Sequence, residues 1–223
     1  SKNATSAGQQ IMDILIETQY LPPLQFFCKF LEYDSVVLEQ WEHYQKNSYR
    51  NRTHLAAANG PIRLSIPLQK GKHQQQQIRE VRISYARNWQ RRHWQSIQSA
   101  YGKAPFFEHY APRLLPLFRQ QPDLLFDWNM SLIRVLLQML QIPENKLQFS
   151  THYQVSPDNQ VRDFREQIGP DDPYGEQDPH FQTAFYPQVF QDKHGFLPNL
   201  SILDVLFCAG PQSVLLLEQS IVR

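Results

Sequence analysis

The sequence predicts an α/β fold, in which a mixed, mostly parallel sheet is flanked by helices and followed by a helical C-terminal region. Three observations support this prediction. Short β-branched apolar runs alternate with segments of helical period. Near the start of the chain, the pattern predicts a strand, then a helix, then a second strand. The last apolar stretch has the spacing of helices. With 223 residues, of which 41% are hydrophobic, the chain can bury one sizeable core. We therefore expect a single domain over residues 11–223, with the polar segment 1–10 disordered or left from an expression vector.

The first predicted elements form a strand–helix–strand unit. Residues 11–18 are apolar and β-branched, which favours a strand, and the apolar residues of 24–31 recur at helical spacing. Residues 35–39 (SVVLE) predict a second strand. Because such units are almost always crossovers between parallel strands, we expect a Rossmann-like sheet.

The middle of the chain predicts further strands and then helices. A turn at 59–61 precedes an alternating strand over 62–66, and the alternation continues at 81–83. Residues 41–55 show no dominant period. From 89 to 142 we expect three helices, separated near Pro105 and Pro122.

The remainder of the chain predicts one more strand and a helical end. A strand is expected over 147–153, and the proline- and acid-rich stretch 156–179 is expected to be irregular. Two helices are predicted over 200–221, with a break at 210–211. The glutamine-rich segment 70–77 can bury little and is predicted to be an exposed, mobile loop.

The charges are balanced overall but unevenly distributed. Against 22 Lys and Arg stand 21 Asp and Glu, and this net charge of +1 argues against a nucleic-acid coat protein or a polybasic membrane binder. Residues 46–103, however, contain twelve Lys or Arg and a single acid, Glu80. Two interpretations stay open: this basic stretch attracts an acidic lobe of the same protein, or it binds a phosphate-bearing ligand.

Cysteines and known motifs exclude several classes of protein. Cys28 and Cys208 lie in apolar runs, so we expect free thiols and a cytoplasmic protein. The apolar stretch 200–222 is interrupted by polar and helix-breaking residues, so we expect a soluble chain without a membrane span. Glycine-rich phosphate loops and zinc-binding motifs are absent from the sequence, and the eight histidines have no ligand spacing, so no metal and no cofactor is predicted.

Three polar blocks supply the candidate binding residues. Gln19 and Tyr20 follow the first strand, where ligands collect in open α/β sheets, whereas the two prolines after them are explained by the start of a helix. The second block, 45–52, concentrates donors that suit a phosphate or carboxylate, or it forms a solvated hairpin face. Its candidate residues are Gln45, Lys46, Arg50, Asn51 and Arg52.

The third block runs from His93 to Phe107 and contains Tyr101 and Lys103; Gly102 is expected to terminate a helix within it. Asp204 lies among apolar residues and therefore needs a partner; its role is either capping or pairing a core cation, or that of a base or a ligand-orienting acid. We take His93 and Asp204 as candidate catalytic residues. The binding residues expected to converge in one pocket are Tyr20, Lys46, Asn51, Arg52 and Lys103.

Five separated blocks together resemble the WbqC-like protein family, over roughly residues 17–216. They are Tyr20-Leu21-Pro22; Gln45-Lys46 with Asn51-Arg52; Asn59-Gly60-Pro61 with Leu64 and Pro67; His93-Trp94 with Ala100 to Pro105 and Phe107; and Leu200 to Phe207 with Gly210. The motif Tyr186-Pro187-Gln188 is also retained, which adds Tyr186 and Gln188 to the candidate binding residues.

The resemblance implies a bacterial cytoplasmic protein of O-antigen or other surface-polysaccharide biosynthesis. It also implies a role in amino-acid transfer, such as the addition of glycine to a sugar. One segment departs from the family pattern, because residues 154–160 and 163–165 are polar and charged where many members carry a Gly/Ser-rich segment followed by Tyr-Leu. The departure removes small residues that let a backbone approach a ligand.

Two classes of function follow. The first is a transferase that moves an amino-acid-like or acyl group to an amino sugar carried on a phosphate-bearing donor. Its cations would hold the anionic part, and His93 or Asp204 would accept the proton of the attacking amine. The alternative is a non-catalytic binding module for a nucleotide sugar, a polyanion or a protein of the polysaccharide machinery. A nucleic-acid partner is disfavoured by the global neutrality.

Overall fold

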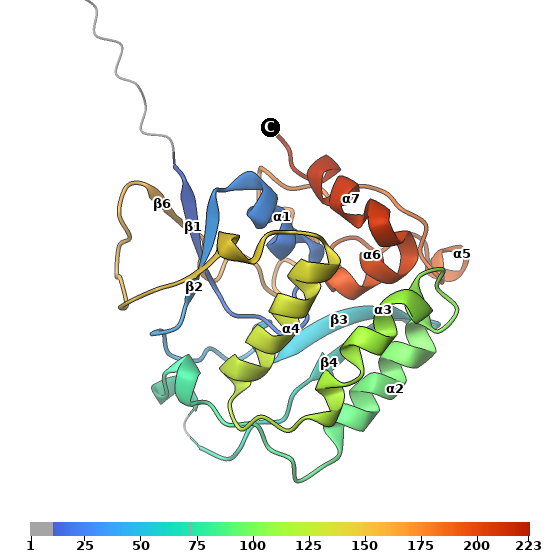
Figure 1. Ribbon diagram of the computed structural model, residues 1–223, viewed down its shortest axis with the longest axis horizontal. Coiled ribbons are helices and arrows are strands. Elements are labelled where there is room, and N and C mark those ends of the chain that lie inside the picture. Colours follow the sequence, from blue (N-terminus) through green and yellow to red (C-terminus); the bar gives the residue numbers. More distant parts are fainter. Residues whose placement is uncertain (1–10, 72) are drawn as a thin grey trace, which may run out of the picture.

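The computed structural model describes residues 11–71 and 73–223. The expectation for residues 1–10 and the part of the predicted loop 70–77 that contains Lys72 lie outside the described residues. The α/β fold class is confirmed: a parallel sheet is flanked by helices, and the C-terminal region is helical (Figure 1).

The parallel sheet has four strands in the order β5-β2-β1-β6. They are β1 (Asp13–Glu17), β2 (Ser35–Glu39), β5 (Leu147–Phe149) and β6 (Val161–Asp163), and every neighbouring pair is parallel. Numbered by their sequence within this sheet, the strands stand in the order 3-2-1-4, which matches the first four strands of the Rossmann order 3-2-1-4-5-6. The topological switch point therefore lies between β1 and β6.

The predicted crossover from β1 to β2 is confirmed and runs through α1 (Leu24–Glu32). The apolar stripe of α1 is fully buried, including Phe26, Phe27 and Phe30. At about 1.5–3 kcal/mol for each large apolar side chain, this burial holds α1 on the core. The N-terminus of α1 is itself covered, because Leu200 O accepts from Leu24 N and Asn199 Oδ1 accepts from Gln25 N.

A separate antiparallel hairpin pairs β3 (Arg52–Ala57) with β4 (Gly60–Ser65). Gly60 has φ +114°, which glycine adopts more readily than other residues, and it belongs to the predicted turn. The strand predicted over 62–66 is confirmed in β4, but β3 was not predicted. The strand expected at 81–83 is wrong, because these residues make only isolated bridges, one of them from Leu68 to Ile83.

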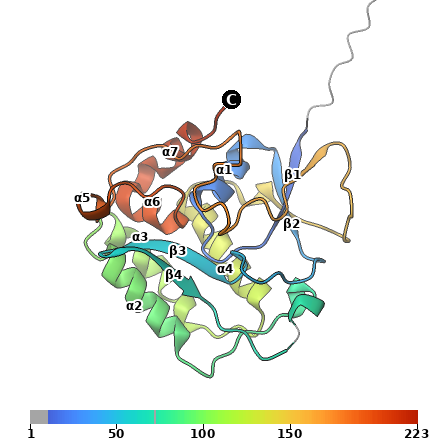
Figure 2. The same cartoon turned by 180° about the vertical axis from the view of Figure 1, so that it is seen from behind.

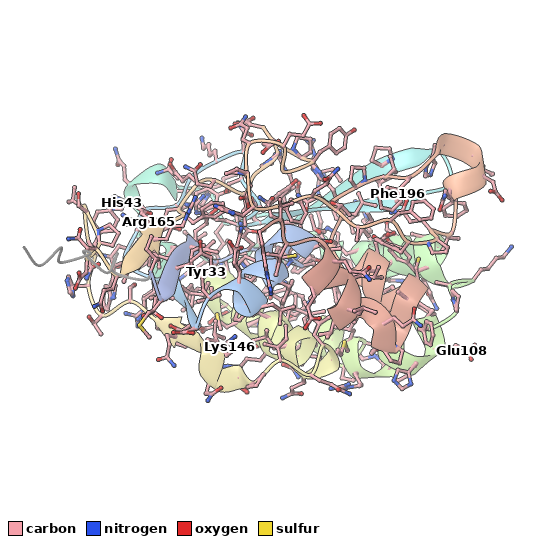
Figure 3. All side chains as sticks on the ribbon, turned by 90° about the horizontal axis from the view of Figure 1, so that it is seen from above. Tyr33, His43, Glu108, Lys146, Arg165 and Phe196 are labelled. Carbon is pink, nitrogen blue, oxygen red and sulfur yellow. The ribbon has the colours of Figure 1, made fainter. Side chains whose placement is uncertain are left out.

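Three helices follow as predicted: α2 (Trp89–Tyr101), α3 (Phe107–Leu114) and α4 (Leu125–Met139). Figure 2 shows the hairpin across the front of the molecule with these helices behind it, and Figure 3 shows the hairpin and α4 on opposite long sides. Short 3-10 turns lie at His73–Gln75, Ile78–Glu80, Leu117–Arg119 (η3), Glu144–Lys146 and Gly210–Gln212.

The C-terminal region contains α5 (Gln191–His194), α6 (Ile202–Ala209) and α7 (Ser213–Gln219), and the predicted break near Gly210 is confirmed. By length and composition Ile202–Gln219 passes as a possible membrane span, which is weak evidence because half of it is buried and core helices pass the same test. Two expectations are corrected. The strand predicted over 147–153 ends at Phe149, and β6 lies inside the stretch expected to be irregular.

Candidate functional site

The carboxyl ends of β1 and β6 open onto a cleft of about 380 Å³. Its position matters because ligands of open α/β sheets bind beyond the carboxyl ends of the strands, at the switch point. We call it the switch-point cleft; it is lined by Glu17, Gln45, Lys46, Asn47, Ser48, Arg50, residues 166–172 and Gln177. A second cavity of about 610 Å³, the outer cleft, shares Gln45 and Glu166 with it. The outer cleft is also lined by Trp41, Glu42, His43, Gln77, Tyr153, Val155, Asp163 and Arg165.

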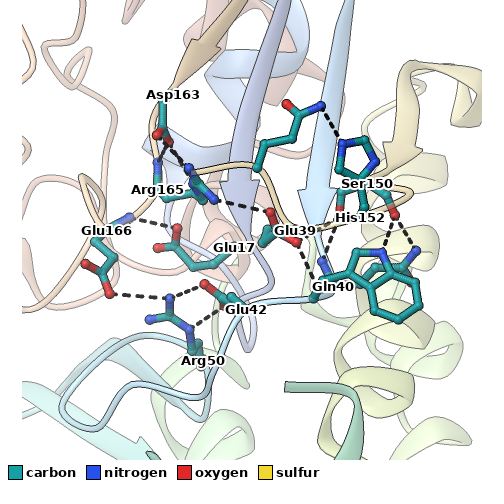
Figure 4. Close-up of polar contacts among 12 residues, drawn as sticks. Glu17, Glu39, Gln40, Glu42, Arg50, Ser150, His152, Asp163, Arg165 and Glu166 are labelled. Carbon is teal, nitrogen blue, oxygen red and sulfur yellow. Dashed lines mark hydrogen bonds and ion pairs between the residues drawn. The ribbon is translucent and has the colours of Figure 1, made fainter. Parts of the chain in front are cut away.

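Buried carboxylates end the two central strands, and both are bonded to residues that follow β6 (Figure 4). Glu39 is fully buried at the end of β2, and its Oε2 lies 3.3 Å from Nη1 of Arg165. Arg165 also donates to both oxygens of Asp163, at 2.9 and 2.8 Å. Glu17 ends β1 and is 2% exposed; its Oε2 accepts from the backbone N–H of Glu166 at 2.9 Å. The end of β6 is thereby tied to the ends of β1 and β2.

Arg50 and Glu42 form a bidentate ion pair beside this network. Nε and Nη2 of Arg50 each lie 2.8 Å from a carboxylate oxygen of Glu42, and both residues are buried. Burial raises the pKa of Glu42, as do the neighbouring charges of Glu17 and Glu39, while the Arg50 guanidinium opposes the shift. The charge of Arg50 is therefore already compensated inside the protein.

The switch-point cleft is more acidic than the sequence analysis predicts. Its lining contains the acids Glu17, Glu166, Asp171 and Asp172 against the cations Lys46 and Arg50. Three of these acids, Glu166, Asp171 and Asp172, come from the segment after β6, which the tertiary structure brings opposite the basic block 45–52. Such a lining favours a polar ligand that carries an amine over one that carries only phosphate.

Glu166 holds a special position between the two clefts. Its backbone lies in the left-handed region with φ +62°, which is uncommon outside glycine and tends to occur at functional sites. The backbone N–H is fixed by Glu17, while the side chain is 60% exposed and its Oε1 lies 3.8 Å from Nη2 of Arg50. Glu166 thus presents a carboxylate to both cavities from a rigid backbone.

Thr18 and Gln19 directly follow Glu17 of the switch-point cleft in the chain and are fully buried. The side-chain amide of Gln19 donates to Glu17 Oε1 and to Ile168 O, both at 3.3 Å. The side-chain oxygens of both residues, Gln19 Oε1 and Thr18 Oγ1, have no partner in the protein. Buried polar atoms of this kind normally bind water or a ligand, so the loop after β1 keeps free acceptors near the cleft.

A phosphate cannot bind here as it does in Rossmann nucleotide sites. That mode needs a glycine-rich turn and an open helix N-terminus, whereas the turn after β1 contains no glycine and Asn199 and Leu200 occupy the first amides of α1. Among residues 11–71 and 73–223, no group of three or more His, Cys, Asp or Glu side chains could hold a metal ion.

His93 and Tyr20, two predicted site residues, are hydrogen-bonded to each other. Nδ1 of His93 lies 2.9 Å from the Tyr20 hydroxyl, and Nε2 lies 3.2 Å from the carbonyl oxygen of Ser65. Burial lowers the pKa of His93 to about 4, so the ring is neutral at pH 7. Because a carbonyl only accepts, Nε2 carries the proton and Nδ1 accepts from Tyr20. A catalytic role for His93 stays a prediction.

Asp204 lies in a second buried cluster that unites four predicted site residues. Its Oδ1 accepts from the Tyr101 hydroxyl at 2.8 Å, and its Oδ2 accepts from Tyr186 at 2.6 Å and from Gln188 at 2.9 Å. Asp204 is fully buried, and burial raises its pKa. The partners of this carboxylate are therefore neutral donors rather than the core cation considered from the sequence, and the cluster joins α2, α6 and the segment before α5.

The five binding residues predicted to converge do not line one common pocket. Asn51 accepts from the Tyr44 hydroxyl and donates to Ile66 O, and Arg52 begins the hairpin. Lys46 lines the switch-point cleft, whereas Lys103 is exposed in the turn between α2 and α3. That turn lies at the far end of the long axis from the parallel sheet (Figure 1). In Figure 3, Arg165 and Glu108 mark these two ends. The predicted convergence of the five binding residues is wrong, because the helix α2 carries Lys103 away from the strand ends.

The sequence analysis missed four residues of this site, and a sequence signal existed for two of them. The predicted strands DILIE and SVVLE both end in glutamate, at Glu17 and Glu39. Acids at the carboxyl ends of two adjacent parallel strands would have pointed to an acidic edge. Arg165 and Glu166 belong to the segment expected to be irregular, where no period identifies a strand end.

Comparison with known proteins places the chain in a family. The model of the WbqC-like protein family matches residues 18–172, more than half of the chain. The chain is also 24% identical over 107 residues to Uncharacterized protein Rv1507c of Mycobacterium tuberculosis, a match that covers 48% of this chain and 46% of that protein. The match thus spans about half the length of that relative, and no solved structure matches the chain. The chain belongs to the WbqC-like protein family.

Proposed function

We propose that the chain is a cytoplasmic transferase of bacterial surface-polysaccharide biosynthesis of the O-antigen type. In this proposal it moves an amino-acid-like or acyl group onto an amino sugar carried on a phosphate-bearing donor. The family match supports this proposal through the biosynthetic role that the resemblance implies. The observation that carries the proposal is the carboxylate of Glu166, held between two polar clefts beyond the carboxyl ends of a parallel sheet.

The lining of the switch-point cleft suits an amino sugar. Glu166, Asp171 and Asp172 offer carboxylates to an amine, and Gln45 and Asn47 offer amides to sugar hydroxyls. The lining contains two cations of the basic block 45–52. Arg50 is paired with Glu42, whereas Lys46 forms no ion pair among the described residues. It can stabilise negative charge that develops on the acyl oxygen.

The reaction is an acyl transfer to nitrogen. The sugar amine attacks the carbonyl carbon of the activated donor, so a C–N bond forms and the bond between that carbon and the leaving group breaks. The leaving group departs with the electron pair, and the amine proton passes to the Glu166 carboxylate. General-base catalysis of this kind contributes about 10²–10⁴-fold in rate.

Glu166→Gln tests the proposal, with Glu176→Gln as a matched control, because Glu176 is exposed and lines neither cleft. Each protein is incubated with a nucleoside-diphosphate-linked amino sugar and an aminoacyl or acyl thioester, and the mass gain of the sugar is measured. Wild type and Glu176→Gln should form product, while Glu166→Gln should be about a hundredfold slower. The same sugar with its amine acetylated should give no product. Equal rates for the two variants would contradict the role of Glu166.

A non-catalytic binding module is the second candidate, and one observation favours it. The buried carboxylates Glu17, Glu39 and Glu42 all hold bonds inside the protein, so they stabilise the cleft and are not free for chemistry. In that case the amino-sugar nucleotide would raise the melting temperature of the wild type without any turnover. Glu166→Gln would then change affinity alone.

A further inference from the structure

The outer face of the β3–β4 hairpin carries positive charge that the protein does not compensate. In the register of the hairpin, His54 stands opposite Arg63 and Arg52 stands opposite Ser65. Arg52, His54 and Arg63 therefore share one face, because side chains alternate along a strand and Thr53 and Leu55 are buried on the other. Among the described residues neither arginine forms an ion pair.

The guanidinium of Arg52 has unused hydrogen-bonding capacity. Its Nε is buried and has no partner in the protein, and its Nη2 makes only a 3.5 Å contact with Asn47 Oδ1. Burial and the charge of Arg63 lower the pKa of Arg52, and burial together with both arginines lowers the pKa of His54. The two guanidinium groups thus repel each other, and an anion placed between them would relieve this repulsion.

A groove of about 290 Å³ opens beside these cations. Its walls include His54, Pro61, Arg63, Pro173, Tyr174 and Pro198, and its lining contains no carboxylate. Most of the lining is apolar, and Tyr174 is 49% exposed there, so an aromatic ring is available for stacking. Ligand pockets have volumes of about 300–1,000 Å³. The volume of this groove is close to the lower limit, so the groove can hold one ring system.

The walls of the groove are rigid. Asp172 accepts from the backbone N–H groups of Glu176 and Gln177, both at 2.9 Å, which fixes the turn that carries Tyr174. On the other side of the groove, Asn199 Oδ1 accepts from the backbone N–H of Gln25, and Asn199 Nδ2 donates to Gln25 Oε1, both at 3.0 Å. A ligand therefore does not have to order these segments when it binds.

We propose that this hairpin groove binds a nucleoside diphosphate, with the base against Tyr174 and the phosphates over Arg63 and Arg52. The groove accepts a planar apolar ring, and the arginines offer forked donors that match phosphate oxygens. An acidic peptide would use the arginines but not the groove, and a free phosphate would likewise leave the groove unused. This inference stands whether or not the chain transfers an acyl group.

The groove lies beside the switch-point cleft. Asp172 lines the cleft while Pro173 and Tyr174 line the groove, and Arg52 contacts Asn47 of the cleft. A nucleoside diphosphate that carries an amino sugar thus has the two halves of its structure matched by two neighbouring cavities. Only this extension rests on the proposed function.

Calorimetric titration with adenosine, guanosine, cytidine, uridine and thymidine diphosphates tests the inference, because none of these probes carries a sugar amine. At least one should bind, more weakly at higher salt, and its free nucleoside and inorganic pyrophosphate should each bind less tightly. Arg63→Gln should weaken the binding at least about tenfold, since a charge-assisted hydrogen bond is worth ~1.5–3 kcal/mol. Arg119→Gln, which removes an exposed arginine at the end of η3, should change nothing.

Tyr174→Ala should also weaken the binding about tenfold, and Tyr174→Phe should restore it, because the ring and not the hydroxyl stacks on the base. Both Tyr174 and Arg63 are exposed, so these variants are expected to fold. No binding by any of the diphosphates would overturn the inference, and so would equal affinity for pyrophosphate and the nucleoside diphosphates. Glu166→Gln should leave the affinity unchanged, which separates this test from that of the proposed transfer.

Discussion

His93 should make the protein less stable in mild acid. The native ring is neutral because burial lowers its pKa from 6.5 to about 4. As the pH falls below 6.5, the unfolded chain binds a proton at this histidine and the native protein does not, so unfolding becomes more favourable. The effect grows until the pH reaches the native pKa and is constant below it.

The size of the effect follows from the two pKa values. At ~1.4 kcal/mol for each tenfold change in proton affinity, a drop from 6.5 to about 4 lowers the free energy of unfolding by about 3 kcal/mol between pH 7 and pH 4. Other groups titrate in the same range. The informative quantity is therefore the difference between the wild type and His93→Gln at each pH.

Urea denaturation at a series of pH values measures this difference. The stability advantage of the wild type over His93→Gln should shrink as the pH falls from 7 to 4, while His152→Gln, which replaces an exposed histidine, should follow the wild type. Proton NMR of the eight histidines gives a direct check, because one ring should remain neutral to about pH 4. A native His93 that titrates near 6.5, or a constant difference across the range, would refute the reasoning.

Three further outcomes are expected. Asp204→Ala removes the shared acceptor of three buried donors, two of them tyrosine hydroxyls, and should lower the free energy of unfolding by about 3 kcal/mol in urea titrations; a loss below about 1 kcal/mol would contradict the cluster's role. Arg50→Ala should cost about 3–5 kcal/mol because it leaves the Glu42 carboxylate buried without its partner, and Arg50→Lys should recover only part, since lysine cannot make both 2.8 Å contacts. Cys28 and Cys208 should resist a thiol reagent in the native protein at pH 7 and react in urea, because burial raises the pKa of both thiols; rapid labelling of the folded protein would count against this.

Local patterns predicted the framework of the fold because periodicity depends on which residues face the core. The unit β1–α1–β2, the three central helices and the break near Gly210 all follow from apolar spacing and from turn residues. The strand β3 was missed because the polar residues Arg52 and His54 are its outward-facing positions, next to a block without a clear period. The short strand β6 has too few residues to show one.

The candidate sites depended on contacts that no local pattern records. From the sequence, the block 45–52 is basic and suits a phosphate, yet Arg50 is paired with Glu42, and the segment 166–172 makes the cleft acidic. Asp204 receives its donors from residues 16 to 103 positions away. The sequence by itself therefore determined the α/β class, the strand–helix–strand unit and the family. Only the tertiary structure decided which charges are compensated and which stay free, because burial and charge pairing are set by residues distant in the chain.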